Sequence, residues 1–234
     1  MYKAILFDLD GSLLPLDEKQ FIKIYFGGVS KRFADKYDSQ EFLDALWKGT
    51  LAMMNNDGSA TNENVFWKTF KKYIQGDYQA IEKEFSDYYK TDFSAVKATC
   101  KPNPYSKKII DYLKQKDIKL VLATNPLFPA VATLERIKWA GLTSSDFEVI
   151  TTYEDNYYCK PNLNYYRDIL NRINCHAEEC LMVGNDVRED MVVGKLGMDT
   201  YLLTECLINS NQEDIEKFKF GKLEDFYRLL LIDF

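Results

Sequence analysis

Five short runs of mostly apolar residues constrain the fold of this chain more than any other feature. They lie at residues 4–7, 118–123, 147–150, 180–183 and 200–203. Apolar residues follow one another in these runs instead of alternating, which predicts strands covered on both faces, as in a parallel sheet. Helix-like stretches at 130–139, 163–173 and 191–196 separate the later runs. This alternation predicts an α/β fold with right-handed crossovers.

The interval from residue 15 to residue 97 breaks the alternation, because it holds no clear strand. It contains stretches rich in aromatic residues and helical in pattern, at 21–33, 40–54, 62–74 and 79–89. Turn-forming residues separate these stretches, and the pair Gly27–Gly28 indicates a bend in the first of them. We therefore expect a core domain of residues 1–14 and 98–234, and a helical domain of residues 15–97 inserted directly after the first strand.

Charge and length limit the kinds of partner. The chain has 36 acidic and 30 basic residues, a formal net charge of −6. This balance argues against binding to nucleic acid or to an anionic membrane surface, both of which favour a basic protein. No apolar run reaches the roughly 18–20 residues that a bilayer span needs, and the apolar start is too short for a signal peptide.

Cysteine and histidine usage limits metal chemistry and compartment. The five cysteines include no CxxC pair, which predicts reduced thiols, and the single histidine excludes a zinc site that needs two histidines. We therefore expect a cytoplasmic protein. The expected oligomeric state is a monomer or a weak homodimer.

The first candidate motif follows the first predicted strand and reads Asp8-Leu9-Asp10-Gly11-Ser12. Two carboxylates at this spacing point the same way in an extended segment, and the chain can turn at Gly11. Paired carboxylates suit a hard cation, or a nucleophile beside a proton donor. The alternative is a polar strand exit, since Asp-Gly is a common turn.

Three further motifs follow later predicted strands, where open α/β sheets bind ligands. Thr124 and Asn125 offer a hydroxyl and an amide for a phosphate oxygen, although either could cap a helix instead. Lys160, before a proline, could place an ammonium near an anion, although most lysines are solvated surface residues. Asp186 and Asp190 are four residues apart and could complete an oxygen-rich Mg²⁺ site, or simply start a helix.

Together these motifs resemble the haloacid dehalogenase-like (HAD) hydrolase superfamily. The resemblance rests on the order Asp-x-Asp-Gly-Ser, Thr-Asn, Lys-Pro and Gly-Asn-Asp-x-x-x-Asp, and it covers roughly residues 1–14 and 98–205. It implies a Rossmann-like parallel sheet with helices on both faces, and it identifies the inserted helices as a C1 cap. Many members read Gly-Asp where this chain reads Gly-Asn-Asp, which leaves the metal ligand open.

The resemblance also implies roles for individual residues. Asp8 matches the nucleophile that forms an aspartyl-phosphate, and Asp10 matches the general acid/base. Thr124 matches the hydroxyl that binds the phosphoryl group, with Asn125 beside it. Lys160 matches the lysine that neutralises the nucleophile and the phosphate.

A magnesium ion completes the expected site. The resemblance implies that Asp8 and the backbone carbonyl of Asp10 are ligands. Asp186 or Asn185 matches the third ligand, with Asp186 favoured by its spacing to Asp190, the second acid of that loop. Carboxylates and a phosphate repel one another, so a cation between them is required, and Mg²⁺ suits oxygen ligands.

Asp10 favours phosphoryl transfer over dehalogenation, because a departing halide needs no proton. The expected activity is therefore Mg²⁺-dependent hydrolysis of a small phosphorylated metabolite. A phosphoglucomutase-like isomerase and a non-catalytic HAD-like binding protein are the alternatives. Six cap residues could reach the substrate or could form the cap's own core: Tyr25, Phe26, Trp47, Met53, Met54 and Asn55.

Overall fold

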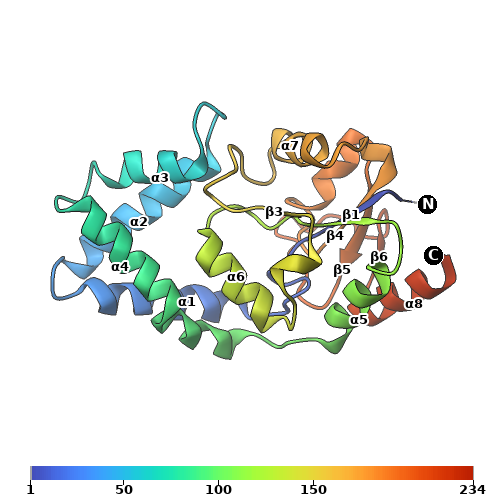
Figure 1. The fold of residues 1–234 in the computed structure, drawn as a ribbon, viewed down its shortest axis with the longest axis horizontal. Helices are drawn as coiled ribbons and strands as arrows, with labels where there is room; N and C mark the ends of the chain where they lie inside the picture. The colour runs from blue at the N-terminus through green and yellow to red at the C-terminus, as the bar shows by residue number, and fades with distance from the viewer. Residues whose placement is uncertain (1, 234) are drawn as a thin grey trace.

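A six-stranded parallel sheet forms the centre of the protein in a computed structural model that describes residues 2–233 (Figure 1). The strands are β1 (Ala4–Phe7), β2 (Lys119–Leu122), β3 (Val149–Ile150), β4 (Cys180–Gly184), β5 (Asp199–Leu203) and β6 (Lys219–Gly221). Their spatial order is β3-β2-β1-β4-β5-β6, and every neighbouring pair is parallel. The winding reverses between β1 and β4, and ligands of open α/β sheets bind at such a point.

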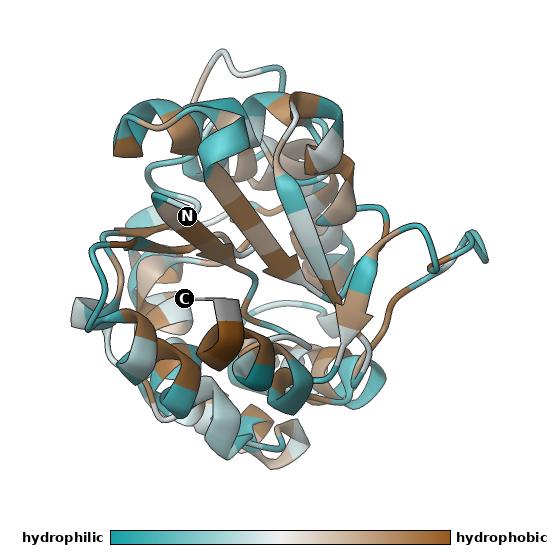
Figure 2. Cartoon of the chain, turned by 90° about the vertical axis from the view of Figure 1, so that its right-hand side faces the viewer, coloured by the Kyte–Doolittle hydropathy of each residue, from teal (hydrophilic) through white to brown (hydrophobic). Residues whose placement is uncertain are grey.

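Helices cover both faces of the sheet, as Figures 1 and 2 show. They are α5 (Pro104–Leu113), α6 (Ala130–Trp139), α7 (Leu163–Ile173) and α8 (Leu223–Asp233). Ile5 and Phe7 of β1 belong to the core that includes α5, α6 and α8, whereas Ala4 and Leu6 belong to the core that includes α7. Both faces of β1 are therefore buried, which explains its unbroken apolar run and confirms the predicted α/β fold.

Four α-helices and a 3₁₀ helix connect β1 to α5 and lie to the left of the sheet in Figure 1. They are α1 (Glu18–Phe33), α2 (Ser39–Met54), α3 (Asn62–Phe70), α4 (Tyr78–Lys90) and η1 (Asp92–Thr99). The side chains of Asp17, Asp38, Thr61 and Asp77 each accept a hydrogen bond from the first turn of the following helix. These caps explain where each helix begins.

Aromatic rings hold the four helices together. The rings of Phe33 and Phe42 stack with centroids 4.3 Å apart, and the ring of Phe85 lies 4.8 Å from Phe33. Helix α1 runs through its glycine pair without interruption, so this pair does not end the helix. A Cβ at Gly28 would lie 2.6 Å from the Tyr88 hydroxyl, which shows that this glycine allows α1 to approach α4 closely.

Some elements were not expected from the sequence. Strand β6 has only three residues and none of them is buried, so it lacks the apolar run that marks the other strands. Helices α5 and α8 were also missed, although Asn103 and Pro104 form a recognisable start for α5. The stretch at 191–196 is a 3₁₀ helix. In the described part of the chain, no helix is long and apolar enough to cross a membrane.

Candidate active site

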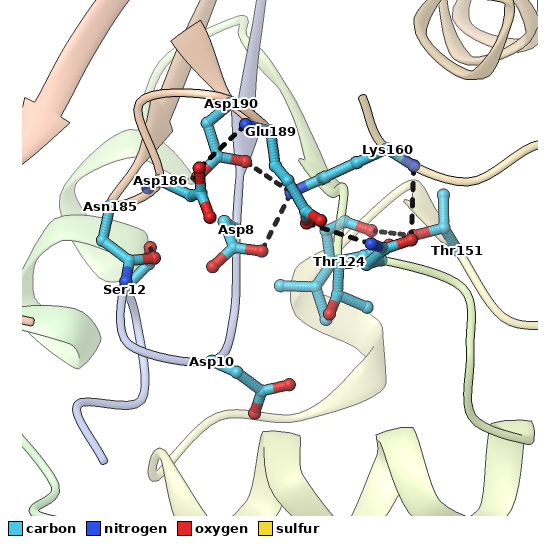
Figure 3. A network of polar contacts seen from close by, with 12 residues as sticks. Asp8, Asp10, Ser12, Thr124, Thr151, Lys160, Asn185, Asp186, Glu189 and Asp190 are labelled. Carbon is cyan, nitrogen blue, oxygen red and sulfur yellow. Dashed lines mark hydrogen bonds and ion pairs between the residues drawn. The ribbon is translucent and has the colours of Figure 1, made fainter. Parts of the chain in front are cut away.

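Polar residues follow the strands β1, β2, β3 and β4 at one edge of the sheet (Figure 3). Asp8, Thr151 and Asn185 come directly after β1, β3 and β4, and Thr124 lies two residues beyond β2. A cavity of about 290 Å³ opens at this edge. The expected site residues that line it are Asp8, Asp10, Thr124, Asn125, Asn185, Asp186 and Asp190. Trp47, Thr50 and Met54 of α2 line its other side, so the inserted helices lie over the carboxylates.

Lys160 joins two carboxylates, those of Asp8 and Asp190, which line this cavity, although Lys160 itself does not line it. Its Nζ donates to Asp8 Oδ1 at 2.9 Å and to Asp190 Oδ1 at 2.6 Å, and its side chain is 1% exposed. Burial alone would lower the pKa of Lys160, but the carboxylates of Asp190 and Asp8 raise it well above its usual range. The lysine is therefore a fixed positive charge against the Asp8 carboxylate.

Asp190 ties this charge to the loop after β4. Its Oδ2 accepts a hydrogen bond from the backbone N–H of Asp186 at 3.0 Å. Burial raises the pKa of Asp190 to about 6, and the ammonium of Lys160 opposes that rise. A Cβ at Gly184 would collide with the Asp190 carboxylate, so the loop requires glycine at that position.

The two candidates for the metal ligand after β4 are placed differently. The Asn185 amide is held at both ends, since its Oδ1 accepts from the Ser12 hydroxyl at 2.9 Å and its Nδ2 donates to the Cys206 carbonyl at 2.6 Å. Asp186 Oδ1 accepts from the backbone N–H groups of Arg188 and Glu189. Both residues line the same cavity as Asp8, but both ends of the Asn185 amide are engaged by Ser12 and Cys206, which favours the carboxylate of Asp186 as a ligand.

Thr124 and Asn125 lie before α6 and do not cap it, since its N-cap is Pro129. Thr124 is 2% exposed and lines the cavity. Asn125 joins neighbouring loops: its Nδ2 donates to Glu189 Oε2 at 3.0 Å and its Oδ1 accepts from the Lys160 backbone N–H at 3.2 Å. The amide of Asn125 therefore positions Lys160 directly.

Asp10 stands apart from this group, as Figure 3 shows. Its Oδ2 forms an ion pair with the buried guanidinium of Arg136 in α6. Its Oδ1 is buried and has no hydrogen-bond partner within residues 2–233. Burial raises the pKa of Asp10, and Arg136 opposes that rise. The Arg136 guanidinium also donates to the Thr133 hydroxyl and stacks 4.5 Å from the centroid of Phe128, so the arginine is firmly held.

The Asp10–Arg136 ion pair makes a specific kinetic prediction. Arg136→Met removes the partner of Asp10 while keeping an apolar chain of similar length in the helix interface. We expect kcat for the reaction at this site to fall about 100-fold, which is within the rate enhancement that a positioned general acid or base usually contributes. In the Asp10→Asn background the same change should alter kcat less than about threefold, because the carboxyl group that Arg136 pairs with is already absent. Steady-state rates of the four proteins test this coupling, and equal losses in both backgrounds would show that Arg136 acts independently of Asp10.

Sequence reasoning missed Arg136, Thr151 and Glu189, and it included Ser12 in the first motif without giving it a role. Arg136 had a signal, because it falls on the apolar face of α6 with buried Ala132 and Ile137. A charge on such a face is unusual unless it is paired. Glu189 had none, since it occupies one of the three unspecified positions between Asp186 and Asp190. Burial raises its pKa to about 7 in the folded protein.

The donor set fits magnesium. Among residues 2–233 there is no group of three His, Cys, Asp or Glu side chains that could hold a metal ion, which disfavours a site made of side chains alone. Asp8 and Asp186 are among the acidic residues that line one cavity, and Asp10 lines it too. Mg²⁺ is usually bound by one or two carboxylates and keeps several waters, so this sparse oxygen set suits it.

The fold and site define an α/β protein in which a lysine-paired aspartate lies beneath inserted helices. Residues 2–196 match the family model for haloacid dehalogenase-like hydrolases, and the chain belongs to this family. It is 23% identical to a glyceraldehyde 3-phosphate phosphatase of Methanothermobacter thermautotrophicus, covering 93% of this chain and 92% of that protein. It is 22% identical to a ribulose-1,5-bisphosphate 5-phosphatase of Halopiger xanaduensis, covering 86% and 84%. The structure of the HAD hydrolase YfnB of Bacillus subtilis bound to magnesium aligns with a TM-score of 0.57 at 21% identity, over 98% and 99% of the two chains.

Proposed function

We propose that this hydrolase is a Mg²⁺-dependent phosphatase that removes phosphate from a small phosphorylated metabolite through an aspartyl-phosphate on Asp8. The observation that carries the proposal is the Asp8 carboxylate. It lies at the end of the central strand, borders the cavity, and is held 2.9 Å from the buried ammonium of Lys160. The names of the relatives, both phosphatases of sugar phosphates, support the same substrate class.

In the proposed reaction an Asp8 oxygen attacks phosphorus while the bond from phosphorus to the ester oxygen breaks. The electron pair leaves on the ester oxygen, which takes a proton from Asp10. Asp10 then removes a proton from a water that attacks the phosphorus of the aspartyl-phosphate. This second step releases inorganic phosphate and restores the Asp8 carboxylate.

Other residues hold the phosphoryl group and its charge. The fixed charge of Lys160 stabilises the negative charge concentrated around Asp8 during transfer. The Thr124 hydroxyl is proposed to donate to a phosphoryl oxygen, since this buried residue borders the cavity. The helices of residues 15–97 are proposed to act as a cap domain over the core domain of residues 1–14 and 98–234, excluding water from the cavity.

Asp8, Asp186 and the backbone carbonyl of Asp10 would hold the magnesium ion. When bound, Mg²⁺ would neutralise phosphate oxygens and so permit an anionic nucleophile to approach an anionic ester. Asn185, whose amide is committed to Ser12 and Cys206, is proposed to shape the loop.

Release of inorganic phosphate tests this function. The panel contains glyceraldehyde 3-phosphate, ribulose 1,5-bisphosphate, phosphoglycolate and p-nitrophenyl phosphate, each with Mg²⁺ and with EDTA. We expect turnover with Mg²⁺ and a loss of about 100-fold or more with EDTA, which added Mg²⁺ reverses. Turnover unaffected by EDTA would contradict the metal assignment. A folded protein that releases no phosphate from any ester would contradict the phosphatase assignment, and conversion of hexose 1-phosphate to 6-phosphate would then be assayed.

A further inference from the structure

A second cavity adjoins the catalytic one and extends between the inserted helices and the core. We call it the aromatic pocket. It has a volume of about 250 Å³. Its walls include Phe21, Tyr25, Phe26, Trp47, Phe128 and Tyr153. The only charged side chains that line it, among the residues the structure describes, are the carboxylates of Asp10 and Glu18.

Asp10 connects the two cavities. Trp47, Thr50 and Phe128 also border both of them. The buried Oδ1 of Asp10 lacks a hydrogen-bond partner in the described chain, so it is the carboxylate oxygen that Arg136 does not engage. A phosphate ester whose phosphorus faces Asp8 would therefore pass Asp10 at its ester oxygen, and the rest of its leaving group would enter the aromatic pocket.

We propose that the leaving group of the substrate is an uncharged alcohol with an apolar or aromatic body. This inference rests on the phosphatase function proposed above and narrows its substrate class. Aromatic walls favour burial of apolar surface and ring stacking. A cavity of roughly 150 Å³ with apolar walls binds benzene, so the aromatic pocket has room for at least one ring. A second phosphate or a carboxylate would meet two acids in this pocket and no lining cation, because the nearby guanidinium of Arg136 is already paired with Asp10, and this is unfavourable.

A wider groove on the other side of Asp10 gives an anionic leaving group no better site. It is lined by three lysines, Lys19, Lys101 and Lys222, and by five acids, Asp10, Asp17, Glu18, Glu205 and Glu224. The acids outnumber the lysines, so the groove carries no excess of positive charge for a second phosphate. Neither space around Asp10 is therefore suited to a bisphosphate.

Two esters with similar intrinsic reactivity test the proposal. Ethyl phosphate and 2-phenylethyl phosphate both release a primary alcohol, but only the second has a ring to bury. We expect kcat/KM for 2-phenylethyl phosphate to be higher by about tenfold or more, from the apolar surface buried. Ribulose 1,5-bisphosphate should be the poorer substrate. Equal values for the two simple esters, or a preference for the bisphosphate, would overturn the proposal.

A charge at the rim of the pocket provides the matched variant. Ile22 of α1 lines the pocket and is 46% exposed, so Ile22→Arg should fold. It should lower the preference for the phenylethyl ester at least about threefold and improve use of the bisphosphate. Leu51→Arg is the control, because Leu51 is similarly exposed on α2 but does not line the pocket. Equal effects of the two substitutions would argue against the pocket.

Binding separates failure of this proposal from failure of the phosphatase function. Tryptophan fluorescence of the Asp8→Asn protein, titrated with the two esters, reports occupancy through Trp47 without turnover. Tighter binding of the phenylethyl ester by a protein that never releases phosphate would support the pocket and contradict the phosphatase. Binding without preference would overturn the pocket even in an active phosphatase.

Discussion

Asp8→Asn is expected to lower the rate of phosphate release by about four orders of magnitude or more, as loss of a nucleophile does in other covalent mechanisms. Asparagine keeps the shape of the side chain but removes the negative charge that attacks phosphorus. The variant also loses the charge paired with Lys160 at 2.9 Å, so circular dichroism should verify its fold before rates are compared. Phosphate release from p-nitrophenyl phosphate with Mg²⁺ provides the measurement.

The matched control for this substitution is Asp35→Asn. Asp35 is exposed just after α1 and lines none of the cavities around Asp10, so the activity of the Asp35→Asn protein should equal that of the wild type. Residual activity of Asp8→Asn above about 1% of wild type would contradict a covalent role for Asp8.

Lys160→Met is expected to give the largest loss of stability. The substitution leaves the carboxylates of Asp8 and Asp190 without their shared cation in a buried place. Breaking a buried ion pair from one side costs about 3–5 kcal/mol in free energy of unfolding. For a chain of this size that corresponds to a fall in Tm of about 10 °C. Urea denaturation provides the free energy and thermal melting the temperature.

Two further variants show whether charge causes this loss. Lys36→Met removes a lysine whose ion pair with Glu84 is exposed, so it should cost less than about 1 kcal/mol. Lys160→Met combined with Asp190→Asn removes one uncompensated charge and should recover part of the lost stability. A single Lys160→Met protein that unfolds at the wild-type urea concentration would contradict a charged, buried lysine at this site.

The sequence predicted the sheet well because burial on both faces leaves a direct trace. The strands β1, β2 and β4 each contain at least three buried residues in succession, and all lie within the expected runs or one residue beyond them. Polar residues at the ends of such strands must meet at one edge, so Asp8, Thr124 and Asp186 could be placed together without coordinates.

Contacts between distant elements left no such trace. The pairing of Arg136 with Asp10 joins α6 to the loop after β1, and spacing within either segment says nothing about it. The choice between Asn185 and Asp186 as metal ligand depends on the hydrogen bonds that the Asn185 amide makes to neighbouring loops. Ser12 and Cys206 bind Asn185 through side-chain and backbone atoms that lie far from it in sequence.

The inserted helices show the same limit. Helical spacing predicted their positions, but it could not tell which aromatic residues pack together and which face a cavity. Tyr25, Phe26 and Trp47 line the aromatic pocket and Met54 lines the catalytic cavity, whereas Met53 is buried in the core. Only the packing of α1 against α2 and α4 decides between these outcomes.

Fluorine NMR of the protein with Mg²⁺ and beryllium fluoride tests the central claim most directly. Trifluoroberyllate binds a carboxylate nucleophile in place of a phosphoryl group, so it reports the nucleophile and its surroundings without a natural substrate. We predict bound fluorine resonances for the wild type with Mg²⁺, and none for Asp8→Asn or for the wild type with EDTA. The same resonances in Asp8→Asn, or none in a wild type that releases phosphate, would contradict an aspartyl-phosphate on Asp8.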